Sequence, residues 1–149
     1  MSHTETVHPA EQPADESRLR QLLAQGLARR YTVRARAEGP EFIIEGVEEP
    51  ARLPTIQGEV GTVIRPTSSP VPAPEATAAI RVVVERLQLE LKAIEQAGLA
   101  AYFLLVADCA RYGRSGGATC VARGSAPGSM VNYLLDISTV DPIRHGLLF

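Results

Sequence analysis

The sequence predicts a helix-rich α+β fold, and three features of the chain support this prediction. Residues 18–31 and 76–117 place apolar side chains at steps of three and four, which indicates amphipathic helices. Residues 31–47 alternate apolar and polar side chains around a Gly-Pro pair, which is typical of a β-hairpin. Residues 122–129, ARGSAPGS, form a glycine- and serine-rich turn directly before another apolar segment.

The chain begins with a polar, acidic lead and one short helix. Residues 1–15 contain no apolar core, and we expect them to be disordered. Residues 18–31, RLRQLLAQGLARRY, place four leucines at helical spacing and end with basic side chains, which suit the negative end of a helix. This segment predicts an amphipathic helix.

A hairpin and a linker complete the unit that we assign to residues 16–74. YTVRARA and FIIEGV, on either side of AEGPE, predict two paired strands. VGTVI, residues 60–64, is a candidate third strand. RPTSSPVPAPE, residues 65–75, contains four prolines in eleven residues, which is typical of an extended linker.

Two helices open the remaining unit, residues 75–149. Residues 76–98 form a long helix with an apolar stripe, and Gly98 suits a left-handed helix cap. The stripe consists of Ile80, Val83, Val84, Leu87, Leu91 and Ile94. Residues 100–117 predict a second, more apolar helix that ends near Gly113. Its apolar richness indicates packing inside a larger body, with much of its surface buried.

The last segments alternate between extended and helical patterns. ATCV, residues 118–121, predicts a short strand that leads into the Gly-Ser turn. SMVNYLLDI, residues 129–137, resumes the helical pattern. Asp141 is a candidate N-cap with Pro142 at the first helical position. The predicted order is helix, helix, strand, Gly-Ser turn, helix.

The charge, apolar content and cysteines of the chain limit the kinds of molecule that it could bind. Fifteen basic and seventeen acidic residues give a formal net charge of −2, so the whole chain is not a cationic surface for nucleic acid or membrane. No apolar run approaches the length of a membrane span, and we expect a soluble, cytoplasmic protein without membrane contact. Cys109 and Cys120 have no CxxC motif or histidine pair nearby, so we expect buried thiols rather than a zinc or disulfide site.

The Gly-Ser turn has the residue types of an anion-binding site. A strand that runs into a glycine-rich turn and then a helix brings free backbone N–H groups to the positive end of the helix dipole. Gly124 and Gly128 would let the backbone approach a phosphate oxygen. Ser125 and Ser129 would add hydroxyl donors, and Arg123 a bidentate contact, which together suit a triphosphate. The alternative is a plain turn and helix cap, and the Gly-Lys-Ser/Thr ending of a Walker A loop is absent.

Three sequence motifs occur in a characteristic order. RLQLELKAIEQAGLAAYFLLVADCARYGRSGG is followed by ARGSAPGS and then by YLLDISTVDPIRHGLLF. In this order residues 79–149 resemble the start of the palm domain of the bacterial C-family DNA polymerases, which are the alpha subunit of DNA polymerase III and its error-prone relatives. RLRQLLAQGLARRY also resembles the segment that precedes this region. Residues 32–74, approximately, match no segment that we can place and look like an insertion or a divergence.

The resemblance implies a fold, a reaction and partners. The fold would be part of a nucleotidyltransferase palm like that of polymerase beta. Arg123, Gly124 and Ser125 would contact the triphosphate of the incoming deoxynucleotide (dNTP), with Gly128 and Ser129 completing the turn. A primer 3′-hydroxyl would attack the α-phosphate with the help of two Mg²⁺ ions. Primer-template DNA and replisome subunits would bind through other parts of the parent chain.

The resemblance also implies that this chain is a fragment without catalytic residues. In the family the catalytic carboxylates follow the Leu-Leu-Phe end of the third motif, the first two in an Asp-x-Asp arrangement. We therefore expect no metal ligand in this chain and no DNA synthesis by the chain alone. Asp136 and Asp141 are expected to serve a helix terminus and an N-cap. Asp108 is expected to pair with Arg111, three residues on.

Two residues in the motif depart from the family pattern and leave alternatives open. Ala122 replaces a glycine, which restricts a backbone that would need positive φ. Pro127 replaces an alanine, which removes an N–H donor and biases Ala126 away from helical geometry. The alternatives to a polymerase fragment are a stand-alone nucleotide-binding or regulatory module, a non-functional remnant, and an unrelated helical scaffold. A fragment should expose apolar helix faces and self-associate.

Overall fold

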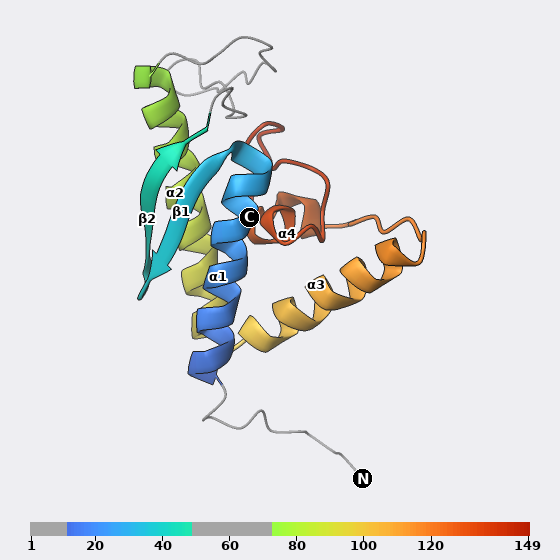
Figure 1. Ribbon diagram of the computed structural model, residues 1–149. Helices are drawn as coiled ribbons and strands as arrows, with labels where there is room; N and C mark the ends of the chain where they lie inside the picture. The colour runs from blue at the N-terminus through green and yellow to red at the C-terminus, as the bar shows by residue number, and fades with distance from the viewer. Residues whose placement is uncertain (1–11, 49–72) are drawn as a thin grey trace.

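The computed structural model describes residues 12–48 and 73–149, and its helix-rich α+β class is the predicted one (Figure 1). The elements in chain order are α1 (Gln12–Tyr31), β1 (Val33–Glu38), β2 (Glu41–Val47), α2 (Ala73–Gln96), α3 (Ala100–Ser115), the 3₁₀ turn η1 (Ala126–Gly128) and α4 (Met130–Leu134). Within the described ranges, no single helix is long and apolar enough to cross a membrane. Only α2 and α3 taken together, bent by 113° at their junction, have that length and composition.

Helix α1 forms as predicted but begins earlier. It starts at Gln12, so the expected end of the disordered lead at residue 15 is wrong, and the lead's first eleven residues lie outside the described ranges. Asp15 in its first turn and two arginines in its last turn complement the helix dipole, which favours helix over this whole segment. Leu19, Leu23 and Leu27 are completely buried and form the inner face of α1.

The predicted hairpin is confirmed. Strands β1 and β2 pair antiparallel from Val33 opposite Val47 to Glu38 opposite Glu41, with a register shift beside Arg34. Gly39 makes the tight turn at φ +56°, a value that glycine tolerates best. Strand β1 packs on α1, and Val33 of β1 and Phe42 of β2 are buried in the core. The candidate third strand at 60–64 and residues 65–72 of the expected linker lie outside the described residues.

Helix α2 carries the predicted apolar stripe and ends at the predicted cap. Its buried side chains belong to the same core as those of α1, β1, β2 and α4. Gly98 adopts φ +67°, and the amide of Leu99 donates to the carbonyl of Ile94 at 3.0 Å, so the left-handed cap is confirmed. The helix starts at Ala73, so the last three residues of the expected linker are helical. Pro74 lies in the first turn, where a proline is tolerated.

Helix α3 extends away from the rest of the molecule and packs only along one side (Figure 1). Phe103, Leu104 and Ala107 contact the core, and Ala100 is its one fully buried side chain. Leu105 and Tyr112 on the other side are 62% and 82% exposed. The expected extensive burial of α3 is therefore not reached within this chain. The helix ends at Ser115, close to the predicted end.

The predicted strand at residues 118–121 does not form. Among the described residues β1 and β2 pair only with each other, so this segment has no strand to pair with. Arg114 on α3 instead donates to the carbonyl of Cys120 at 3.4 Å. Cys120 is half-buried and Cys109 is exposed, because Cys109 lies on the side of α3 that the core does not cover. The prediction of a buried thiol is thus wrong for Cys109.

The C-terminal segments are shorter helical turns than predicted. Helix α4 covers only five of the nine residues expected at 129–137, and Asp136 follows it at φ +59°, which ends the helical geometry. Asp141 does cap the next turn, because its Oδ1 accepts hydrogen bonds from the amides of Ile143 at 2.9 Å and Arg144 at 3.1 Å. That turn, residues 142–146, is not continued into a helix.

Candidate nucleotide-binding site

A buried carboxylate on α2, Glu90, organises the Gly-Ser turn. Glu90 is completely buried. Its Oε1 accepts hydrogen bonds from Arg86 Nε at 2.7 Å and the Met130 amide at 2.9 Å. Its Oε2 accepts from Ser129 Oγ at 2.9 Å and the Val131 amide at 3.1 Å. Because the first amides of a helix have no partner within the helix, Glu90 acts as an internal anion at the start of α4.

Arg86 connects this carboxylate to the turn and to the end of the chain. Its Nη2 donates to the carbonyl of Gly128 at 2.7 Å and to that of Leu147 at 3.1 Å. The turn is so close to the C-terminal segment that a Cβ on Gly128 would lie 2.1 Å from the carbonyl oxygen of Leu148. We call Arg86 and Glu90 the Arg-Glu brace, since together they fix the base of the turn.

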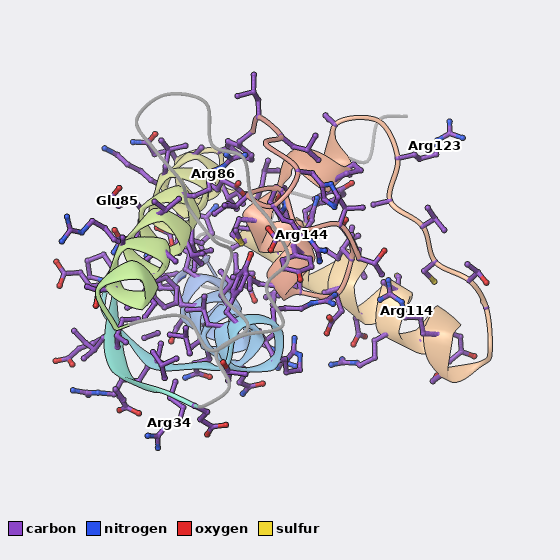
Figure 2. The ribbon with its side chains drawn as sticks, turned by 90° about the horizontal axis from the view of Figure 1, so that it is seen from above. Arg34, Glu85, Arg86, Arg114, Arg123 and Arg144 are labelled. Atoms are coloured by element: carbon purple, nitrogen blue, oxygen red, sulfur yellow. The ribbon has the colours of Figure 1, made fainter. Side chains whose placement is uncertain are left out.

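The five predicted site residues fall into two groups. Arg123, Gly124 and Ser125 are exposed, and Figure 2 shows Arg123 at the edge of the molecule on the loop that leads into the turn. Gly124 has φ +68° and open space around it, so glycine is needed there for its backbone and not for packing. Gly128 and Ser129 are buried. The Ser129 hydroxyl donates to Glu90 and accepts from the Asn132 amide at 3.1 Å, so it serves as a helix cap.

The two departures from the family pattern are accommodated by the backbone. The non-glycine residues with positive φ in the described ranges are Thr32 and Asp136, so Ala122 does not carry the expected strain. Pro127 lies in the first turn of η1, where its missing N–H needs no partner. The expected bias of Ala126 away from helical geometry is wrong, because η1 begins at Ala126.

The acidic residues of this region serve structural roles. Asp136 forms ion pairs with Arg29 at 3.0 Å and Arg30 at 2.7 Å, and Asp108 pairs with Arg111 as predicted. Within the parts of the chain that the structure describes, no three or more side chains of Asp, Glu, His or Cys gather where they would hold a metal ion. These residues therefore do not fit a Mg²⁺ site.

Two tyrosines, Tyr31 and Tyr133, have raised pKa values, and the charge of Asp141 contributes to both. Burial raises the pKa of Tyr31 far above its usual value, and the negative charge of Asp141 raises it further. Burial also raises the pKa of Tyr133, and the negative charge of Asp141 raises it further. The Tyr31 hydroxyl lies 3.6 Å from the sulfur of Met130 on α4, so it contributes to the packing under the Gly-Ser turn.

The Arg-Glu brace was not predicted from the sequence, although the sequence contains a signal for it. Glu90 falls on the apolar stripe of α2, three residues after Leu87 and four before Ile94. A carboxylate on a buried stripe needs hydrogen-bond donors, and Arg86 is placed one helical turn earlier to provide one. The other donors come from residues about 40 positions later and cannot be located by helical spacing.

The chain belongs to the family described as the bacterial DNA polymerase III alpha NTPase domain, whose family model matches residues 17–149. This confirms the resemblance to the bacterial C-family DNA polymerases. The chain is 49% identical over 67 residues to an error-prone DNA polymerase of Anaeromyxobacter sp. (strain K), 44% over 70 residues to DNA polymerase III subunit alpha of Yersinia pestis, and 50% over 66 residues to that of Mycobacterium tuberculosis (strain ATCC 25618 / H37Rv). These alignments cover 45%, 46% and 44% of the chain and 6% of each relative.

Proposed function

We propose that residues 75–149 form the first part of the palm domain of a bacterial C-family DNA polymerase, and that the Gly-Ser turn contacts the triphosphate of the incoming dNTP. Membership of the polymerase III alpha family supports this proposal. The observation that carries it is the contrast between an exposed loop, Arg123 to Ser125, and a rigid base in which every polar group of Glu90 is satisfied.

The exposed part of the turn has suitable groups for phosphate oxygens. The Arg123 side chain has no ion-pair partner within the described ranges and is free to make a charged contact. Ser125 offers a hydroxyl, and Gly124 leaves its backbone open to close approach. Because the Arg-Glu brace already fixes the base of the loop, binding would cost less conformational entropy than ordering a free loop.

The parent enzyme would be a DNA-directed DNA polymerase that acts on primer-template DNA and works with replisome subunits. In that reaction the primer 3′-hydroxyl attacks the dNTP α-phosphate and pyrophosphate leaves. The family implies Mg²⁺, but among the described residues no three side chains of Asp, Glu, His or Cys gather where they would hold it. We expect no primer extension by the 149-residue chain.

Calorimetric titration of the chain with dATP and dAMP tests the nucleotide contact. We expect dATP to bind more tightly than dAMP in the presence of Mg²⁺. Arg123→Gln should lower the dATP affinity about tenfold, the effect of losing a charged hydrogen bond. Arg81→Gln, an exposed arginine on α2, is the matched control and should bind as the unmodified chain does.

Two outcomes would favour other functions. Unchanged dATP affinity in Arg123→Gln would favour a purely structural role, in which the Gly-Ser turn only caps α4. Tight dATP binding in EDTA would favour a stand-alone nucleotide-binding module. One observation favours the stand-alone module: the Arg-Glu brace that fixes the loop is formed by residues of this chain alone.

A further inference from the structure

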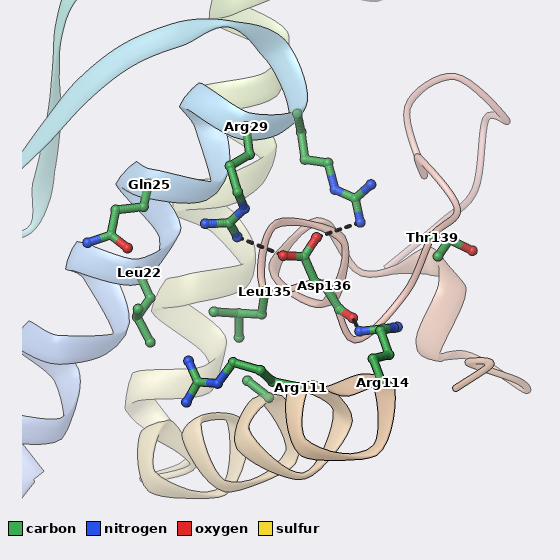
Figure 3. A pocket seen from close by; sticks show the side chains of 10 residues that line it. Leu22, Gln25, Arg29, Arg111, Arg114, Leu135, Asp136 and Thr139 are labelled. Atoms are coloured by element: carbon green, nitrogen blue, oxygen red, sulfur yellow. Dashed lines mark hydrogen bonds and ion pairs between the residues drawn. The ribbon is translucent and has the colours of Figure 1, made fainter. Parts of the chain in front are cut away.

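A cavity of about 440 Å³ lies between α1, α3 and the segment after α4, and four arginines line it. Arg29 and Arg30 come from α1, and Arg111 and Arg114 from α3, so basic side chains approach the cavity from both helices. Figure 3 shows Arg29 and Arg111 on opposite sides and Asp136 between Arg29 and Arg114. We call this cavity the arginine pocket. None of residues 123–129 lines it, so it is separate from the Gly-Ser turn.

The arginine pocket has an excess of positive charge. Asp136 is the one acidic side chain of its lining, and its carboxylate is shared by Arg29 and Arg30. Arg114 donates to the backbone carbonyls of Asp136 and Cys120 and has no carboxylate partner within the described ranges. Arg111 pairs with Asp108, but both side chains are about two-thirds exposed, and such surface pairs contribute little. Neither guanidinium group has a buried carboxylate partner within the described ranges, so both positive charges can attract an anionic ligand.

The shape of the pocket favours a phosphate group over a carboxylate. Arginines on two opposing helices can donate to oxygens that point in several directions, as the tetrahedral oxygens of phosphate do, whereas a planar carboxylate serves one or two arginines. Leu22, Ala107 and Leu135 form an apolar part of the wall, which lowers the local dielectric constant and strengthens charged contacts. The volume lies within the range of small-ligand pockets, about 300–1,000 Å³.

We infer that the arginine pocket binds a phosphate group, with Arg111 and Arg114 of α3 as its main contacts, Arg29 and Arg30 of α1 facing them, and Asp136 as an internal anion that competes with the ligand. The same chemistry is offered by a free polyphosphate and by the phosphodiester backbone of a nucleic-acid strand. This inference does not depend on dNTP binding by the Gly-Ser turn.

The test uses the 149-residue chain with Arg123→Gln throughout, so that phosphate binding at the Gly-Ser turn is weakened in every variant alike. Tripolyphosphate and a 12-nucleotide oligothymidylate are titrated separately by calorimetry in 50 mM NaCl. We expect at least one probe to bind, and the double variant Arg111→Gln/Arg114→Gln to bind it at least tenfold more weakly. Arg81→Gln is the control for loss of one exposed arginine, and its affinity should change less than twofold.

Asp136→Asn provides a test that a folding defect cannot imitate. Asparagine tolerates the positive φ of this position, and the substitution removes the competing carboxylate from the pocket. We expect the affinity for the probe to rise several-fold. Circular dichroism spectra of all variants should match that of the parent.

The two probes distinguish the source of the phosphate. Tripolyphosphate binding that depends on Arg111 and Arg114 identifies a free polyphosphate site, and binding of oligothymidylate alone identifies a contact to a nucleic-acid backbone. Either result supports the inference. Binding of neither probe, equal affinity in the double variant, or no gain in Asp136→Asn would overturn it.

Discussion

The Arg-Glu brace predicts that Glu90→Gln will strongly destabilise the fold. Glutamine has nearly the same shape as glutamate, but one of its two terminal atoms is an NH₂ group. In the structure each carboxylate oxygen accepts two hydrogen bonds, so the NH₂ group would face two donors and Arg86 would lose its charge partner. The burial of Glu90 prevents water from replacing these contacts.

The size of this effect follows from the burial and pairing of the groups. Removing one partner of a buried ion pair costs about 3–5 kcal/mol of unfolding free energy. For a chain of this length that loss lowers the midpoint of thermal unfolding by roughly 10–15 °C. It is a large part of the total stability of a typical domain, about 5–15 kcal/mol.

Urea denaturation followed by circular dichroism at low protein concentration measures this change. The matched control is Glu85→Gln on the same helix, because Glu85 is exposed, and Figure 2 shows its side chain on the outside of α2. The control should change the unfolding free energy by less than about 0.5 kcal/mol. A loss below about 1 kcal/mol for Glu90→Gln, or an equal loss in the control, would refute the role that we assign to the brace.

Three further predictions concern packing, pH and association. Gly128→Ala should lower the unfolding free energy by about 1–3 kcal/mol in the same urea assay, because its new methyl group would overlap the carbonyl of Leu148. Above pH of about 10, unfolded tyrosine loses its proton while Tyr31, whose pKa is raised by burial and Asp141, keeps it, so stability should fall by up to about 1.4 kcal/mol per pH unit. Tyr31→Phe should reduce this slope in denaturation experiments between pH 9 and 11, and an unchanged slope would contradict the assignment. Sedimentation velocity should show self-association of the chain that Leu105→Lys reduces, since Leu105 lies on the exposed side of α3. A monomeric parent chain would count against this last prediction.

The sequence predicted the elements whose signals are local. The leucines of α1, the apolar stripe of α2 and the Gly98 cap depend on spacing within one helix, and the hairpin depends on alternation around Gly39. The boundaries were less accurate, because Pro74 at the start of α2 was interpreted as part of a linker although a first helical turn tolerates proline. The strand at 118–121 was predicted from residue preference alone, and a strand also needs a partner.

The residue types of the candidate site could be predicted from the sequence, but the direction and partners of each side chain could not. The Gly-Ser motif was correctly located as a turn before a helix. That Ser129 faces inward could not be predicted, because its direction depends on Glu90, 39 residues earlier in the chain. The arginine pocket depends on the approach of α1 to α3, and spacing within either helix gives no information about that approach.

The Arg-Glu brace also bears on the order in which the molecule folds. Arg86 and Glu90 are one helical turn apart and can meet as soon as α2 forms, but the remaining donors to Glu90 lie 39 to 41 residues later. The hydrogen bonds that satisfy buried Glu90 therefore form only when α4 docks, and we expect α2 and α4 to dock in one cooperative step. Helix α3, which lies between them in the chain and has a single fully buried side chain, is not needed for that step. We expect its amides to exchange hydrogen by local opening, well before those of α2.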